Sequence, residues 1–134
     1  MEKKNPVDEA RRYVDNAKKL LVENGELDVE THSYNDRKYV KMAGNTLWNG
    51  VLYILDAVFH VRSDRRRHVD IEDYRKAVGV RDRKLLRFVN MAYDHMHIDM
   101  GYFGAQNKDL CDSCFRMANE IIDRCAVMLP GVNG

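Results

Sequence analysis

The longest run of regularly spaced apolar residues in this chain lies between residues 39 and 61. One set recurs at intervals of three and four residues: Val40, Ala43, Leu47, Val51, Ile54, Val58 and Val61. A second set follows the same spacing on an adjacent face: Trp48, Leu52, Leu55 and Phe59. A helix that is apolar over most of its circumference has to be covered by several neighbours. The pattern therefore predicts a central helix enclosed by others.

The same periodicity predicts the remaining helices. We expect long helices over residues 6–23, 36–62, 82–100 and 107–128, and a short helix over residues 70–79. Asn5, Asp70 and Asn107 stand where N-capping residues are preferred. No stretch alternates with a period of two, so no strand is expected. Mostly short connections favour an all-α, mostly antiparallel four-helix bundle with one additional short helix.

Length and composition bound the class of protein. The 134 residues predict a single domain over residues 1–134, with an ordered core over about residues 6–129. No apolar run reaches the roughly 18 residues that a membrane helix needs, so no membrane partner is expected. No signal peptide is visible in the charged N-terminus, and three cysteines imply no disulfide framework. Cytoplasmic residence is the simplest interpretation.

The cysteines leave two interpretations open. Cys111 and Cys114 form a Cys-x-x-Cys pattern in the first turns of a helix, where the helix dipole lowers a thiol pKa in redox motifs. However, both lie with Cys125 on the apolar stripe of that helix, and free cysteine packs as a small hydrophobe. We favour core packing. No second ligand pair has zinc-site spacing, and no phosphate-binding loop is present, so neither a metal nor a cofactor is expected.

A group of polar residues shares one face of the helix expected over residues 82–100. Asn90, Asp94 and His97 recur at helical spacing. A histidine beside an aspartate three residues away can serve as an oriented base or a metal ligand. The alternative is a polar network between helices that fixes their register. We favour the network, because no nucleophile is identifiable nearby.

Charge is unevenly distributed along the chain. Residues 62–87 contain ten Lys or Arg and five acidic residues, whereas the whole chain has a formal net charge of +1. The densest part is Arg65, Arg66, Arg67 and His68. Such a patch is a candidate for phosphate contacts with nucleic acid. The favoured alternative is a solvated link between helices, because the basic run is short and acids are interspersed.

Three features together resemble a known family. They are the long apolar helix over residues 39–61, the short capped helix that begins Asp70-Ile-Glu-Asp, and the later pattern Lys84-Leu-Leu, Asn90-x-x-Tyr93, His97 and Gly101-Tyr. Over most of residues 6–128 the chain resembles an uncharacterised family of small bacterial helical-bundle proteins, which implies no established activity. More distantly it is similar to HEPN domains, helical bundles that usually form dimers.

The distant resemblance to HEPN domains implies candidate site residues. Many HEPN proteins are ribonucleases of toxin–antitoxin or defence systems, and two protomers contribute an Arg followed by a His after four to six residues. Here Arg62 and His68 have that spacing, at the end of the long apolar helix rather than near the start of a late helix. They would stabilise and protonate the scissile phosphate, with Arg87, Asn90 and His97 as supporting candidates.

Two functional hypotheses follow. The first, which we favour, is a homodimeric, non-enzymatic helical-bundle interaction protein that binds a protein partner through a helical face. The second is a HEPN-like RNA-binding protein or metal-independent ribonuclease of a toxin–antitoxin or defence system. A nuclease would gather its candidate residues in a basic cleft between protomers, whereas an interaction protein would scatter them and expose an apolar or methionine-rich groove.

Overall fold

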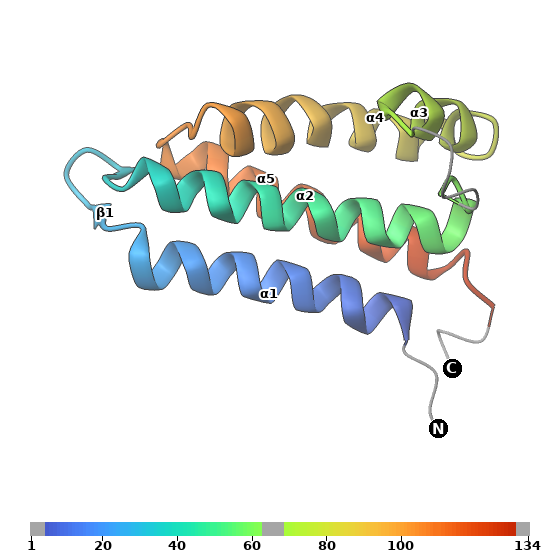
Figure 1. Cartoon of the computed structure of the whole chain (residues 1–134), viewed down its shortest axis with the longest axis horizontal. Helices are drawn as coiled ribbons and strands as arrows, with labels where there is room; N and C mark the ends of the chain where they lie inside the picture. Colours follow the sequence, from blue (N-terminus) through green and yellow to red (C-terminus); the bar gives the residue numbers. More distant parts are fainter. Residues whose placement is uncertain (1–4, 63–68, 131–134) are drawn as a thin grey trace.

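The computed structural model describes residues 5–62 and 69–130 of the chain, which are mostly helical (Figure 1). The elements, in chain order, are α1 (Pro6–Asn24), β1 (Leu27–Asp28), β2 (Ser33–Tyr34), α2 (Arg37–Phe59), α3 (Ile71–Gly79), α4 (Arg83–Ala92), the π-helix η1 (Tyr93–Tyr102) and α5 (Lys108–Ala126). Among the described residues, no helix has the length and apolar character needed to cross a membrane.

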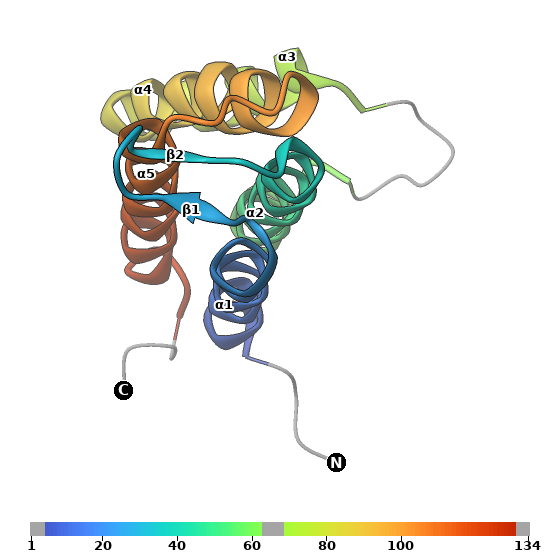
Figure 2. The ribbon, with the colours of Figure 1, turned by 90° about the vertical axis from the view of Figure 1, so that its left-hand side faces the viewer.

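The helices lie lengthwise beside one another. Figure 1 shows that α1, α2, the joined α4 and η1, and α5 reverse direction one after another along the chain. In the view of Figure 2, α2 lies between α1 on one side and the joined α4 and η1 on the other. The prediction of an all-α fold is therefore right at the level of class, apart from a small hairpin between α1 and α2.

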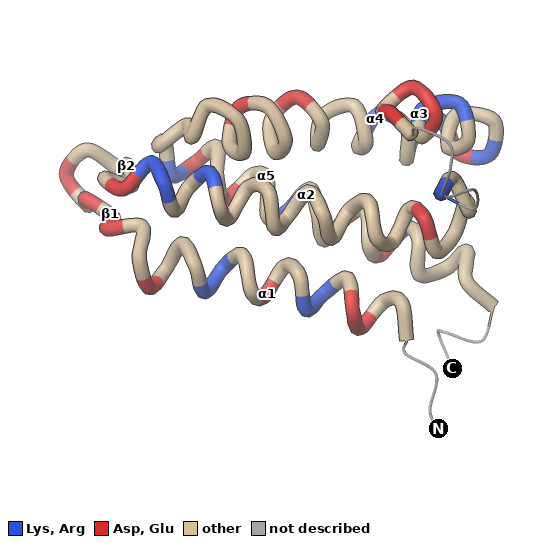
Figure 3. The backbone as a smooth tube through the Cα atoms, viewed as in Figure 1, with Lys and Arg blue, Asp and Glu red and all other residues tan. Residues whose placement is uncertain are grey.

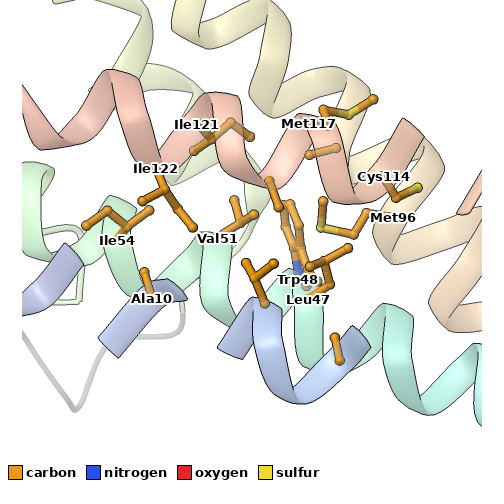
Figure 4. Packing of buried hydrophobic residues seen from close by; sticks show 14 of the residues in the cluster. Ala10, Leu47, Trp48, Val51, Ile54, Met96, Cys114, Met117, Ile121 and Ile122 are labelled. Carbon is orange, nitrogen blue, oxygen red and sulfur yellow. The ribbon is translucent and has the colours of Figure 1, made fainter. Parts of the chain in front are cut away.

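Helix α2 is enclosed as predicted. The carboxylate of Asp36 caps its N-terminus by accepting a hydrogen bond from the backbone of Lys38, and His60 ends it in the left-handed conformation with φ of 55°. Trp48 is only 6% exposed. Side chains from α1, α5 and η1 pack around α2, and Figure 4 shows part of this core. The buried positions of α2 are Val40, Ala43, Gly44, Leu47, Trp48, Gly50, Val51, Ile54, Leu55 and Val58.

The expectation that the chain has no strand is wrong. Leu27 and Asp28 pair antiparallel with Tyr34 and Ser33 in a two-stranded hairpin. Each strand has two residues, which is too short for an alternating pattern to be recognised in the sequence. The backbone of Tyr34 donates to the carbonyl of Gln106, so the hairpin is attached to the segment that precedes α5.

The prediction of one α-helix over residues 82–100 is also wrong. The α-helix ends at Ala92, and the chain continues as the π-helix η1 to Tyr102. A π-helix bonds residue i to residue i+5, is rare and often marks a functional site. Gly44 of α2 lies directly against the backbone of Gly101, because a Cβ at Gly44 would stand 2.7 Å from the Gly101 nitrogen. This close packing of η1 on α2 is a tertiary contact that helical periodicity does not encode.

Candidate functional site

A cleft opens between α2, the start of α3 and η1, and we call it the aromatic cleft. Its volume is about 310 Å³. The residues that line it come from four segments that are far apart in the sequence: Trp48, Leu52, Arg62, Val69, Asp70, Ile71, Tyr74, Tyr93 and His97. The cleft therefore exists only because the chain returns along α2 as η1.

Three rings form one wall of the cleft. The imidazole of His97 stacks on the indole of Trp48, with ring centroids 5.4 Å apart and an angle of 23° between the planes. Tyr93 contacts the Trp48 indole edge-on at 5.9 Å and lies 5.4 Å from the His97 ring. Offset stacked and edge-to-face arrangements are the favourable ones for aromatic pairs. The three rings therefore hold one another in place.

His97 carries a polar atom without a partner. Its Nδ1 is buried and has no hydrogen-bond partner among the described residues. Burial lowers the pKa of His97 below its ordinary value of 6.5. The imidazole is therefore neutral at pH 7, with one nitrogen that donates and one that accepts. A buried polar atom that lacks a partner is uncommon in folded proteins and requires an explanation.

A polar chain also borders the cleft. The Nε of Arg62 donates to the hydroxyl of Tyr74 at 3.0 Å, and that hydroxyl donates to the carboxylate of Asp56 at 3.0 Å. Burial raises the pKa of Tyr74 to about 12 and also raises the pKa of Asp56. The hydrogen bond that Arg62 donates to Tyr74 raises the pKa of Arg62. The Tyr74 hydroxyl therefore stays protonated and fixes the guanidinium of Arg62 at the cleft.

Arg62 retains hydrogen-bonding capacity. Within the described residues, only its Nε takes part in a hydrogen bond, and 56% of its side chain is exposed. The carboxylate of Asp56 is 3.8 Å from that Nε, so the positive charge is partly balanced. The two terminal nitrogens of a guanidinium form the planar fork that suits a carboxylate or phosphate. Arg62 is thus the group in the cleft that is best placed to hold an anion.

Asn90 acts outside the cleft. Its side-chain oxygen accepts a hydrogen bond of 2.8 Å from Nε of Arg75. The guanidinium of Arg75 lies over the ring of Tyr93, 5.3 Å from the centroid, and also pairs with Glu72. A cation over an aromatic face is attracted by the ring. Asn90 therefore helps to position Arg75 on the outer face of Tyr93.

The structure brings together only some of the candidate residues. Arg62 and His97 line the same cleft, although 35 positions separate them in the sequence. Arg87 and Asp94 are exposed on the surface and line no part of the cleft. Arg65, Arg66, Arg67 and His68 lie outside the described residues. Catalytic roles for any of these residues stay a prediction.

The interpretation of Asp94 and His97 as an oriented base, which is the alternative that we do not favour, needs a contact that the described residues do not form. Nδ1 of His97 is unpaired among the described residues, and the ring packs on Trp48 instead. An aspartate three residues before a histidine shares its face only while the helix has α geometry, and this segment is a π-helix. Sequence reasoning also missed a pair that does form, between His95 and Asp99 at 3.0 Å. It missed Tyr74 as a cleft residue too, and no motif marks Tyr74.

The cysteines belong to the core, as favoured. Cys111, Cys114 and Cys125 are free and fully buried on α5. Burial raises the pKa of Cys111 to about 11 and the pKa of Cys114 and Cys125 to about 12. Thiols with raised pKa values are inert, because the thiolate is the reactive form. In the part of the chain that the structure describes, no three His, Cys, Asp or Glu side chains gather to hold a metal ion.

Comparison with known proteins identifies the family. A family model described as "Domain of unknown function (DUF5618)" matches residues 5–127. The chain belongs to the DUF5618 family. This confirms the expected membership of an uncharacterised family.

A solved structure resembles this DUF5618 chain closely. It is a protein of unknown function from Dyadobacter fermentans, with 32% sequence identity and a TM-score of 0.85. The similarity covers 96% of this chain and 100% of that chain. No curated protein matches.

Proposed function

We propose that this protein is a non-enzymatic helical binding module, and that the aromatic cleft takes a small planar molecule that carries a carboxylate or similar anion. The observation that carries the proposal is the guanidinium of Arg62, held by Tyr74, in a cleft that is also lined by the rings of Trp48, Tyr93 and His97.

Size and wall chemistry favour a planar ligand. The volume of about 310 Å³ lies at the lower end of the range for small-molecule sites, roughly 300–1,000 Å³. Such sites are mostly apolar and have a few polar groups that fix orientation. Here Trp48, Tyr93 and Leu52 supply apolar lining, and Arg62, Tyr74 and His97 supply polar groups.

The polar groups favour an anion. Arg62 is held by Tyr74 through Nε, and its two terminal nitrogens form no hydrogen bond with the described residues, so they suit a bidentate contact with a carboxylate. Because Tyr74 and Asp56 already hold this guanidinium, little side-chain freedom is lost when a ligand binds. A single ring with one carboxylate would place its face near the aromatic wall and its charge on Arg62.

The same geometry supports binding more than catalysis. A general acid must be protonated at the working pH, and burial lowers the pKa of His97. Among the described residues, Asp70 lines the cleft and caps α3, and Asp56 accepts a hydrogen bond from the cleft residue Tyr74. Among its described lining residues, the cleft has no serine or cysteine that could act as a nucleophile.

One observation favours a second candidate, a HEPN-like ribonuclease. Arg62 and His97 line one cleft, and an Arg with a neutral His suits phosphate binding and proton abstraction from a ribose hydroxyl. In this second candidate Arg62 would bind the scissile phosphate and His97 would act as the base.

Fluorescence of Trp48 tests the binding proposal directly, because it is the only tryptophan of the chain and lies in the cleft. Benzoate and nicotinate would be titrated in parallel with benzamide and nicotinamide, which have the same ring without the charge. We expect saturable quenching by the acids, and binding about tenfold weaker in Arg62→Gln, because a charge-assisted hydrogen bond contributes roughly 1.5–3 kcal/mol. His97→Phe should also weaken binding.

Arg87→Gln is the matched control, because Arg87 is an exposed arginine outside the cleft. Equal quenching by acids and amides, or equal affinity in Arg62→Gln and Arg87→Gln, would refute an anion site at Arg62. Incubation with labelled RNA at low salt decides between the two candidates. Cleavage that disappears in His97→Phe or His68→Ala would establish the ribonuclease and overturn the non-enzymatic proposal.

A further inference from the structure

Exposed apolar side chains gather at the end of the molecule that carries the hairpin. Five of the exposed large apolar side chains lie on the hairpin, on the start of α2 and at the end of η1. Each is at least 40% exposed: Leu27, Val29, Met42, Tyr102 and Phe103. The rings of Tyr102 and Phe103 contact each other edge-to-face, with centroids 4.9 Å apart. Apolar patches rimmed by charges mark interaction sites on soluble proteins.

One of the two surfaces involved is basic. We call it the basic face, and it consists of Arg37, Lys38, Lys41, Met42, Tyr102 and Phe103. The segment that carries the two aromatic residues is fixed against α2, because Asn45 donates to the carbonyl of Gly101 at 3.3 Å. Gly104 lies against the stems of Arg37 and Lys41, where a Cβ would stand 2.4 Å from the Arg37 Cγ.

The cations of the basic face are available for a partner. Arg37 donates to the side chain of Gln106, and Lys38 lies over the ring of Tyr39. Within the described residues, neither these two nor Lys41 forms an ion pair. A hollow of about 440 Å³ lies among the stems of Arg37, Lys38 and Lys41, beside Met42. A side chain from a partner can enter it.

The other surface is acidic, and we call it the acidic hairpin. It consists of residues 26–30, Glu-Leu-Asp-Val-Glu, in which charges alternate with exposed apolar side chains. Leu27 is 42% exposed and Val29 is 81% exposed. Asp28 shapes the turn by accepting hydrogen bonds from the backbone of Glu30 and Thr31. The hairpin is therefore a formed structure that presents Glu26, Val29 and Glu30 to solvent.

The acidic hairpin and the basic face are complementary in charge, and both carry exposed apolar side chains. Alternating carboxylates and aliphatic side chains on the acidic hairpin correspond to lysines, a methionine and two aromatic rings on the basic face. Figure 3 shows the acidic positions of the hairpin and the basic positions of α2 at the same end of the molecule. Among the described residues of one molecule no ion pair joins them.

We infer that a second copy of this chain is the partner: the acidic hairpin of each copy docks on the basic face of the other. A two-fold axis makes such a contact reciprocal, because each copy contributes its hairpin to the basic face of the other. Because both surfaces lie at one end, a single axis satisfies both contacts. Complementary charges set the register, and burial of the exposed apolar side chains stabilises the pair. The inference does not depend on the ligand of the aromatic cleft.

Charge reversal tests the dimer on the full-length protein. Sedimentation velocity over a micromolar concentration range should show a dimer for the wild type. Lys38→Glu with Lys41→Glu changes the basic face, and Glu26→Lys with Glu30→Lys changes the acidic hairpin. Each double variant should weaken dimerisation about a hundredfold, because like charges placed opposite each other cost several kcal/mol.

A mixture of the two double variants distinguishes lost charge complementarity from misfolding. In a mixed pair, the reversed face of one copy meets the reversed hairpin of the other, and the remaining two surfaces keep their natural charges. Dimer should therefore reappear in the mixture, which a merely misfolded variant could not produce. Lys18→Glu with Lys19→Glu on the exposed side of α1 is the matched control and should leave the dimer intact.

Three outcomes would overturn the inference. They are a wild type that stays monomeric, a dimer that neither double variant weakens, and a mixture of the two that stays monomeric. A monomeric wild type that instead binds a single-stranded oligonucleotide through Lys38 and Lys41 would assign the basic face to nucleic acid. Circular dichroism checks that every variant is folded.

Discussion

Helix α4 and the π-helix η1 are consecutive segments of ten residues each. They differ in how well α-helical spacing in their sequence predicts which side chains share a face. In α4 the buried residues Leu85, Val89 and Ala92 follow α-helical spacing. In η1 the hydrogen-bond pattern changes, and the residues that share a face change with it. Extrapolation of α-helical periodicity therefore holds through Ala92 and places Asp94 beside His97 incorrectly.

The two segments also have different neighbours. Asp82 at the start of α4 accepts hydrogen bonds of 2.7 and 3.1 Å from Arg124, which joins it to α5. By contrast, η1 packs mainly on α2, through Gly101 against Gly44 and through the rings of His97 and Tyr93 against Trp48. Regular α-helix supports the framework here, whereas the π-helix builds the cleft.

The largest expected effect tests whether η1 is packed as firmly on α2 as α4 is on its neighbours. Trp48→Ala should lower the free energy of unfolding by roughly 3–5 kcal/mol, and Leu85→Ala in α4 by about 2–5 kcal/mol. Both side chains are buried. Urea denaturation followed by circular dichroism measures both, because the first variant has no tryptophan. A loss below about 0.5 kcal/mol for Trp48→Ala would show a surface position rather than core.

A smaller effect tests the close approach of the two backbones. At Gly44→Ala the new Cβ would meet the backbone of Gly101 at 2.7 Å, which a side-chain movement cannot relieve. Overpacking of this kind destabilises by roughly 1–3 kcal/mol. Gly79→Ala is the control, because its Cβ would meet only the end of the Leu86 side chain at 3.2 Å. Thermal unfolding compares them, and equal midpoints would mean that η1 is not seated on α2 as described.

The smallest expected effect is on the pH dependence of stability, which should differ between η1 and α4. Burial holds His97 neutral in the folded state, so the unfolded chain binds its proton more readily. Stability should therefore fall as pH decreases through the ordinary His value of 6.5 toward the lower folded pKa. His97→Phe should flatten this part of the profile, measured by urea midpoints from pH 7.5 to pH 5. An unchanged slope would show that His97 is solvated.

The α4 segment responds in a more acidic window. The hydrogen bonds from Arg124 lower the pKa of Asp82 below its ordinary value of 3.8. The stability that this pair contributes is present above that value and is lost as pH falls through it toward the lower folded pKa. Asp82→Asn should therefore lower stability at every pH above that value and change the slope of the profile only in this acidic range, whereas His97→Phe should change the slope only above it.

Much of the fold could be predicted from local sequence patterns. Asn5, Asp36, Asp70 and Asn107 cap helices in the structure, because a short polar side chain binds the free N–H groups of the first turn wherever it precedes a helical stretch. The apolar stripe of α2 predicted its central place correctly. The cysteines of α5 were likewise assigned to the core from their spacing alone.

Only part of the candidate site could be predicted from the sequence. The resemblance to HEPN domains pointed to Arg62, and the polar face pointed to His97. Nothing in the sequence joined the two, since their distance depends on how η1 lies on α2. Tyr74 and Trp48 complete the cleft and looked like ordinary core residues. A cleft is made by residues from separate elements, and periodicity describes one element at a time.

The sequence by itself determined which segments are helical, where they begin and which faces are apolar, because capping and spacing act over one or two turns. Only the tertiary structure decided the π-helical geometry of η1, the stacking of His97 on Trp48 and the juxtaposition of the acidic hairpin with the basic face at one end. Those features depend on which backbones approach closely. That is set by contacts such as Gly44 with Gly101, between residues distant along the chain.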